Sequence, residues 1–176
     1  MGRIVLLATG ERLVGEGVRA FDAVIAGLLE TARREIQIAI YRIDASALPL
    51  LDLLEQAAAR EVWILILVSA LEDQPAPVRE RLESMGRRPR VRVVDFRRAA
   101  GGLLHAKVVL VDRERAVIGS ANLTWGGLVA NHELGVLIEG PEAWEIGRLL
   151  DRLAEATGVP DAFWKKLSQE AGGAET

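Results

Sequence analysis

The sequence has 176 residues, no cysteine, only two histidines and a net charge of −3, and half of its residues are hydrophobic. This composition predicts one ordinary soluble domain over residues 1–176, with its core at about 18–156. It excludes a disulfide framework, a thiol nucleophile and a cysteine zinc site. Two histidines are too few for most histidine metal centres, so we expect activity without a metal or cofactor.

Hydrophobic periodicity predicts strands and helices that alternate along the chain. Residues 4–8 are apolar and could form a short strand, but they are too few for a membrane span or a signal sequence. We therefore expect a cytoplasmic protein without stable membrane association. The helices predicted before the central motif cover 18–33, 46–60 and, after Pro75 and Pro77, a segment that ends near Met85. The predicted strands cover 35–43, 62–68 and 91–96, and a loop follows at 99–104.

After this loop the sequence predicts a β-hairpin, one further strand and two C-terminal helices. The apolar run 108–111 predicts a buried strand, and Val117 begins the return strand after a charged turn at 112–116. The last elements are a strand at 134–139 and helices at 141–156 and 161–170. This alternation predicts an α/β fold, with an α/β/α arrangement of layers around a sheet.

Arginines are concentrated just before the loop that leads to His105. Residues 79–98 contain eight arginines and three acidic residues, a net charge of +5 that leaves −8 for the rest of the chain. An arginine fork can bind two oxygens of a phosphate, so this segment, including Arg97 and Arg98, is a candidate contact for nucleic acid. The alternative is a solvated helix face followed by an edge strand.

The most informative stretch runs from His105 to Glu133 and reads HAKVVLVDRERAVIGSANLTWGGLVANHE. His105 and Lys107 are two residues apart, so we expect them on the same side of the strand that they begin. The return strand ends in G-S-A-N at residues 119–122, which supplies a hydroxyl and an amide. An imidazole, an ammonium and neutral donors that converge on one point suit a phosphate group. Each part alone has a structural explanation as a surface histidine, an edge lysine or a turn.

The pattern H-x-K-x-x-x-x-D followed by G-S-x-N resembles the signature of the phospholipase D superfamily. It is most similar to the short bacterial endonuclease type, which carries one motif per chain. The family's fold is of the predicted layered kind and has a mixed sheet. The resemblance implies that His105 is the nucleophile, which forms a phosphohistidine intermediate. It also implies that Lys107, Ser120 and Asn122 hold the oxygens of the substrate phosphate.

Two acidic residues complete the resemblance. It implies that Asp112 is the motif's structural acid, away from the direct chemistry, and that Glu133 hydrogen-bonds the nucleophilic histidine. A carboxylate on one imidazole nitrogen fixes the tautomer of the ring and stabilises the positive charge that grows during attack. The remaining requirement is a group that protonates the leaving oxygen and then activates water.

In the superfamily a second motif histidine has that role. The only other histidine here is His132, which does not begin a second motif and would point away from Glu133 in a strand. We expect His132 to be exposed or structural. The second imidazole would then come from another copy of the chain, and the resemblance implies a homodimer with a shared active site.

The sequence defines the reaction better than the substrate. We expect a nuclease that cleaves DNA or RNA, because the chain is short, is arginine-rich before His105 and lacks a membrane element. Trp125 could stack on a nucleobase, or it could pack at the dimer seam, which we favour. One alternative is a phospholipase or phosphatidyl transferase, which needs an apolar groove or an interfacial helix. Another is a module that requires an unidentified partner protein in a multi-protein defence system.

Overall fold

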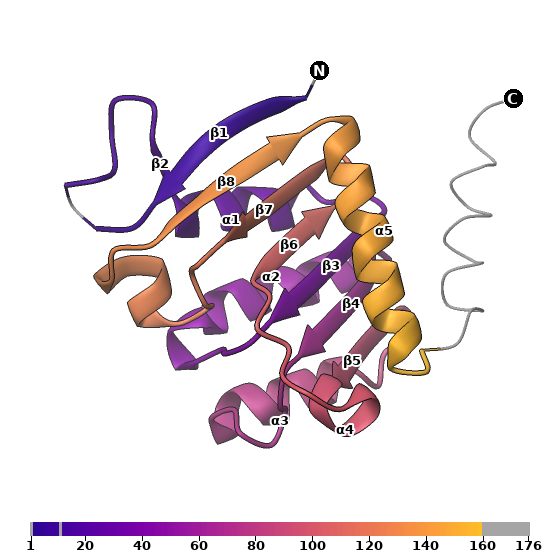
Figure 1. The fold of residues 1–176 in the computed structure, drawn as a ribbon. Coiled ribbons are helices and arrows are strands. Elements are labelled where there is room, and N and C mark those ends of the chain that lie inside the picture. The colour runs from indigo at the N-terminus through magenta and orange to yellow at the C-terminus, as the bar shows by residue number, and fades with distance from the viewer. Residues whose placement is uncertain (1, 11, 160–176) are drawn as a thin grey trace, which may run out of the picture.

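The structure is a computed structural model that describes residues 2–10 and 12–159. Its middle layer is an eight-stranded mixed sheet with helices on both faces (Figure 1), which confirms the predicted α/β/α fold class. The strand order is β2-β1-β8-β7-β6-β3-β4-β5. The strands are β1 Arg3–Ala8, β2 Arg19–Ala20, β3 Glu35–Ile40, β4 Trp63–Val68, β5 Val91–Asp95, β6 Val108–Val111, β7 Arg115–Gly119 and β8 Leu134–Glu139.

The two faces of the sheet carry different helices. Helices α1, α2 and α3 share one hydrophobic core with the sheet, whereas α5 and the short α4 contribute to the core on the other face. The helices are α1 Phe21–Thr31, α2 Leu48–Ala59, α3 Ala76–Met85, α4 Phe96–Ala100 and α5 Pro141–Ala156, with a 3₁₀ turn η1 at Ala45–Ala47 and a π-helical turn η2 at Gly126–Ala130. The helix expected at 161–170, with Trp164, lies outside the described residues.

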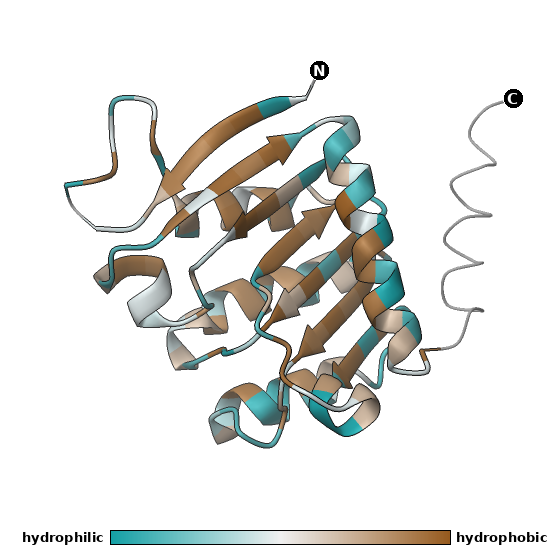
Figure 2. Cartoon of the chain, viewed as in Figure 1, coloured by the Kyte–Doolittle hydropathy of each residue, from teal (hydrophilic) through white to brown (hydrophobic). Residues whose placement is uncertain are grey.

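Strand β3 shows how the sequence pattern produces these layers. Ile36, Ile38 and Ile40 belong to the core on the α1 side, as their alternation predicts, while Ala39 belongs to the core on the α5 side. Every residue of β3 and of its parallel neighbour β4 is buried. Strands covered on both faces favour continuous apolar sequences, and β4 has one, whereas β3 also carries buried Glu35 and Gln37. Figure 2 shows mostly hydrophobic ribbons in the middle of the domain.

The strand predicted at 35–43 ends at Ile40, and three other predicted boundaries were wrong for identifiable reasons. Helix α1 begins at Phe21, because Arg19 and Ala20 pair with the end of β1. The strand predicted at 91–96 ends at Asp95, whose carboxylate accepts the Arg98 N–H at 2.9 Å and caps helix α4, which extends into the expected loop. Strand β7 begins at Arg115, within the expected turn at 112–116.

A pair of glycines brings helix α1 against the sheet next to the G-S-A-N segment at 119–122. Gly119 and Gly135 lie opposite each other on β7 and β8. A Cβ atom on Gly119 would lie 2.7 Å from Cζ of Phe21, and one on Gly135 would lie 2.5 Å from the same atom. Only glycine lets the Phe21 ring approach so closely, so this pair fixes the start of α1 under the ends of both strands.

Candidate active site

The candidate catalytic residues gather at one end of the sheet because neighbouring strands alternate in direction. His105 and Lys107 precede β6, Ser120 follows the antiparallel β7, and Glu133 precedes β8. Strand β3 is antiparallel to β6, so the residues after Ile40 reach the same end. The strand directions thus bring four segments of the chain together at this end of the sheet.

His105 and Lys107 lie just before β6 and not within it, which corrects the expectation that they begin the strand. Their side chains nevertheless meet. Nζ of Lys107 donates to the His105 carbonyl oxygen at 2.7 Å and lies 3.2 Å from Nδ1 of the imidazole. Burial lowers the pKa of the Lys107 ammonium, and the nearby negative charge of Glu133 opposes this effect. His105 is exposed, so an incoming group can reach its ring.

Ser120 and Glu133 form the facing half of the site. The Ser120 hydroxyl donates to the Glu133 carboxylate and accepts the Leu134 N–H at 3.2 Å. The other carboxylate oxygen accepts from Nδ2 of Asn131 at 3.1 Å. The Glu133 N–H donates to Oγ1 of buried Thr9 at 3.1 Å, so β1 helps to hold the residue. Sequence reasoning missed Asn131 and Thr9, because nothing in their spacing marks these contacts.

One expected contact is not made in the single chain. Among the described residues, no hydrogen bond joins Glu133 to His105, because the carboxylate oxygens bind Ser120 and Asn131 instead. Nδ1 of His105 faces Lys107. The hydrogen bond expected between carboxylate and imidazole is therefore not formed in the single chain, and it stays a prediction for the working enzyme. Glu133 still lies near enough to Lys107 to act on its charge.

The Asn122 side chain is hydrogen-bonded to the segment that follows β3. Its Oδ1 accepts the Arg42 N–H at 3.2 Å. A Cβ atom on Gly127 would lie 2.3 Å from the Asn122 carbonyl oxygen, so η2 packs directly on the Asn122 backbone. Asp44 accepts the Trp125 N–H at 3.0 Å, while the Trp125 residue is 59% exposed. That exposure leaves both expectations for Trp125, base stacking and a dimer seam, open.

Asp112 lies at the far end of β6 from Lys107, about 16 Å away at the usual rise per residue of a strand. Its buried carboxylate accepts backbone N–H groups of Arg33, Arg34 and Glu35, with the Arg34 bond at 2.7 Å. These bonds join the β6–β7 turn to the start of β3. The structure therefore separates Asp112 from the other motif residues.

Arg97 and Arg98, at the end of the arginine-rich segment, lie close to acidic residues. Arg97 contacts Asp73 at 3.0 Å and Glu72 at 3.1 Å, and Arg98 lies 3.8 Å from Glu72. Asp73 also accepts from the Arg42 guanidinium through its carbonyl oxygen at 2.9 Å. Arg97 and Arg98 are thus exposed, but a phosphate that binds them must compete with these two acids.

His132 is exposed, and no hydrogen bond or ring contact links it to His105 in the described part of the chain. Its ring lies beside Gly10, where an added Cβ would be 3.1 Å from Cδ2 of the imidazole. Within residues 2–10 and 12–159, no group of three or more acidic, histidine or cysteine side chains has the arrangement of a metal site. None of the helices in these residues has the length and apolar character needed to cross a bilayer.

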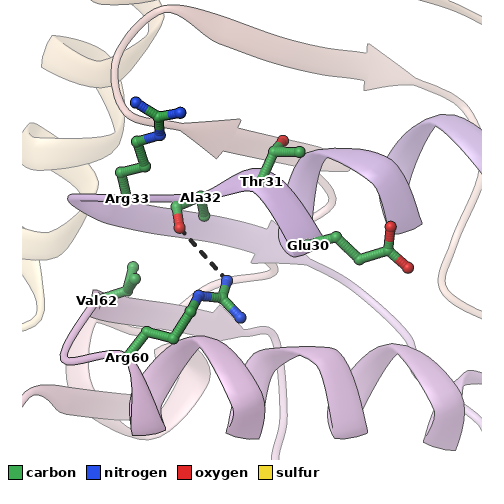
Figure 3. A pocket seen from close by; sticks show the side chains of 6 residues that line it. All are labelled: Glu30, Thr31, Ala32, Arg33, Arg60 and Val62. Carbon is green, nitrogen blue, oxygen red and sulfur yellow. Dashed lines mark hydrogen bonds between the residues drawn. The ribbon is translucent and has the colours of Figure 1, made fainter.

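Several hollows lie outside the His105 cluster, and two of them bear on function. One, at the C-terminal end of α1, is lined by both polar and apolar residues, and Nη2 of Arg60 donates to the Ala32 carbonyl oxygen there at 3.4 Å (Figure 3). Arginine commonly binds the last carbonyls of a helix in this way, so the contact has a structural explanation. The other is an apolar groove, lined mainly by Leu6, Leu13 and Leu134, and it begins beside Glu133.

Comparisons with known proteins agree with this arrangement. A family model described as "Cardiolipin synthase, PLD-like domain" matches residues 25–153. The "DISARM protein DrmC" of Bacillus paralicheniformis is 39% identical over 61 residues, which cover 35% of this chain and 25% of that protein. The "5'-3' exonuclease PLD3" of Rattus norvegicus is 35% identical over 88 residues, which cover 50% of this chain and 17% of that protein. The matches therefore span a quarter or less of these curated relatives.

A solved structure shares the fold over nearly the whole domain. NucT from Helicobacter pylori aligns with a TM-score of 0.68 and 16% sequence identity, over 89% of this chain and 98% of that chain. At this low identity the likeness establishes the arrangement of the elements. The chemistry rests on the residues at the end of the sheet.

Proposed function

Because this chain belongs to the phospholipase D-like family, we propose that it is a metal-independent phosphodiesterase that cleaves DNA or RNA through a phosphohistidine on His105. The observation that supports the proposal is that the His105–Lys107 pair and the Ser120–Glu133 pair lie at the same end of the sheet, with the charge of Glu133 acting on Lys107. Family membership supports a hydrolase-type enzyme. The nuclease specificity, the intermediate and the independence from metals are the proposed part.

The proposed first step is attack of an imidazole nitrogen of His105 on phosphorus. The N–P bond forms, the bond to the leaving alkoxide breaks, and Lys107, Ser120 and Asn122 hold the phosphate oxygens. A second imidazole gives its proton to the alkoxide. It then takes a proton from water, whose oxygen attacks phosphorus and breaks the N–P bond. The products are an alcohol and a phosphate monoester, and the enzyme returns to its starting state.

The contacts of the free chain suggest how Glu133 enters this sequence. Its carboxylate accepts from the hydroxyl of Ser120, while Lys107 faces Nδ1 of His105. A bound phosphate would compete for the Ser120 hydroxyl and for the Lys107 ammonium. Glu133 would then be released to accept the Nδ1–H of His105, which leaves a lone pair on Nε2 for attack. Asp112 would contribute only by fixing the turn at the far end of β6.

The second imidazole is proposed to come from a second copy of the chain. His132 lies exposed beside Gly10, so His105 of another subunit is the simplest source. The surface next to Glu133 supports this proposal, because Leu134 is 65% exposed and Leu6 is 58% exposed on neighbouring strands. Burial of such a patch against its symmetry mate would favour a homodimer.

Nucleic acid is the proposed substrate because PLD3 is described as an exonuclease and because exposed Arg97, Arg98 and Trp125 are available on the chain. One observation favours a phospholipid as the second candidate: the apolar groove beside Glu133 could hold acyl chains. The resemblance to a DISARM protein supports a further proposal, that an unidentified partner protein is required. We also propose a cytoplasmic location without stable membrane association, since the apolar residues 4–8 form part of β1.

The test is a parallel assay of wild type and His105→Ala in EDTA. The substrates are single- and double-stranded DNA, RNA, and liposomes of phosphatidylglycerol. We expect nucleic-acid cleavage by the wild type alone, and no release from liposomes. Glycerol release from the liposomes without any nuclease activity would favour the lipid candidate. Activity that survives the substitution would refute His105 as the nucleophile.

A further inference from the structure

We infer that Tyr41, which lies outside the family motif, is a positioning residue that fixes the imidazole of His105 and the ammonium of Lys107. The inference rests on the proposed function, because it concerns the same nucleophile. The backbone around His105 gives the imidazole little support. His105 is exposed and lies in an irregular segment that follows Gly101 and Gly102, both with a φ of 75°. Such a segment does not by itself hold an imidazole in one orientation.

Tyr41 supplies a fixed surface against this imidazole. The two ring centroids are 5.0 Å apart and the ring planes are inclined by 50°. Nζ of Lys107 lies 5.6 Å from the centroid of the same tyrosine ring. Both distances fall within the usual ranges for aromatic pairs and for cation–π contacts. Tyr41 and Lys107 thus both lie against the His105 ring.

Tyr41 is itself held by the buried side chain of Gln74, which is 3% exposed. Nε2 of Gln74 donates to the Tyr41 carbonyl oxygen at 3.4 Å and to the Ala70 carbonyl oxygen at 2.7 Å. Its Oε1 accepts the Ile43 N–H at 2.9 Å. A buried amide with donors and acceptor all satisfied gives the segment after β3 one conformation.

The same segment also contacts the phosphate-binding side of the site. The Arg42 N–H donates to Oδ1 of Asn122 at 3.2 Å. Residues 41 and 42 therefore lie between the His105–Lys107 pair and Asn122, and they set the separation of nucleophile and phosphate ligand. Attack on phosphorus needs close alignment of the reacting atoms, and a displacement of about 1 Å can cost roughly 100-fold in rate.

The competing role for Tyr41 is substrate stacking, since the residue is 36% exposed. The two roles predict different kinetics. Loss of a positioning contact lowers kcat and leaves KM almost unchanged, whereas loss of a stacking surface raises KM. Phe at position 41 keeps the ring and removes only the hydroxyl. Leu keeps apolar bulk and removes the aromatic face.

The experiment compares Tyr41→Leu and Tyr41→Phe with wild type on a short single-stranded oligonucleotide. It also records NMR spectra of protein labelled at the histidine rings. Because the chain has two histidines, His132 is an internal reference for folding. We expect Tyr41→Leu to lower kcat about 10- to 100-fold with KM within about twofold, and to shift the ring signals of His105 but not of His132. Tyr41→Phe should keep the wild-type kcat and the wild-type ring signals of His105.

Several results would overturn the inference if the wild type is active. A raised KM with an unchanged kcat in Tyr41→Leu would assign substrate stacking. Unshifted His105 ring signals in that variant would show that Tyr41 does not position the imidazole. A wild type that cleaves no phosphodiester would remove the proposed function and this inference together. Normal wild-type cleavage with an unaffected Tyr41→Leu variant would remove only the inference.

Discussion

Nζ of Lys107 lies 3.2 Å from Nδ1 of His105 and donates to the carbonyl oxygen of the same residue at 2.7 Å. An ammonium can only donate hydrogen bonds, so Nδ1 is the acceptor and the hydrogen of a neutral ring lies on Nε2. This tautomer can protonate a leaving group. The nucleophile needs the other tautomer, with Nδ1–H directed to Glu133. Two His105 residues in one shared site would therefore hold different tautomers during the reaction.

The free protein should show the first tautomer alone. In ¹⁵N spectra at about pH 9, we expect the hydrogen of His105 on Nε2, because Lys107 occupies Nδ1. Lys107→Met should remove this preference, and vanadate, a phosphate analogue, should produce signals of the second tautomer in wild type. His132 provides the reference signal in each spectrum. Free wild type with the hydrogen on Nδ1 would contradict the geometry.

Asp112 should act on stability and not on the chemical step. Its φ of 54° is left-handed, a conformation that asparagine tolerates better than alanine. Asp112→Ala loses the hydrogen bonds to the start of β3 and should lower the free energy of unfolding by about 2–4 kcal/mol. Asp112→Asn should lose less, because it keeps an acceptor. Urea unfolding measures both. Equal losses in the two variants would show that the carboxylate oxygens are not the cause.

The buried carboxylate of Glu35 should make stability depend on pH. Burial raises its pKa from 4.5 to about 7, against the opposing charge of Arg113, whose Nε lies 2.6 Å away. Between pH 4.5 and pH 7 the folded protein binds more protons than the unfolded chain. The contribution of Glu35 to the free energy of unfolding is therefore fully present below pH 4.5, and it is lost as the pH rises through 7.

The corresponding loss in wild type should reach about 3 kcal/mol at most, as measured by urea unfolding from pH 5 to pH 8. Glu35→Gln should flatten this part of the profile, because the amide does not ionise. Glu114→Gln, at an exposed glutamate, is the matched control. An equally steep profile in Glu35→Gln would assign the effect to another group.

Leu134 should be required for dimer formation. A charge placed on this exposed apolar strand surface would be buried in a dimer that covers it, so we expect Leu134→Asp to be a monomer with little activity. Leu149→Asp on α5 is the control, since Leu149 is 57% exposed and lies away from the apolar groove. Sedimentation measures the mass of each variant. A dimeric, active Leu134→Asp protein would remove this surface from the account.

The sequence predicted the central strands and the motif residues because their signals are local. The alternating isoleucines of β3, the apolar run of β4 and the spacing of His105, Lys107 and Ser120 can all be identified without knowledge of the fold. The start of α1 was mispredicted because it depends on pairing between β1 and β2.

The contacts that hold the motif residues from outside the motif join distant segments of the chain. Tyr41 meets His105 across 64 positions, and Thr9 meets Glu133 across 124. No periodicity or motif encodes such pairs. The single chain lacks the expected bond from Glu133 to His105 for a related reason, because Asn131 and Ser120 bind the same carboxylate.

The most direct test of the account is native mass spectrometry of the wild-type enzyme trapped with acid-free quenching during cleavage of an oligonucleotide, followed by peptide mapping. The account predicts a dimer that carries one phosphoryl-linked adduct, attached to His105 of one subunit. An adduct on another residue, two adducts per dimer, or a fully active monomer that carries its own adduct would contradict a shared site with one attacking imidazole.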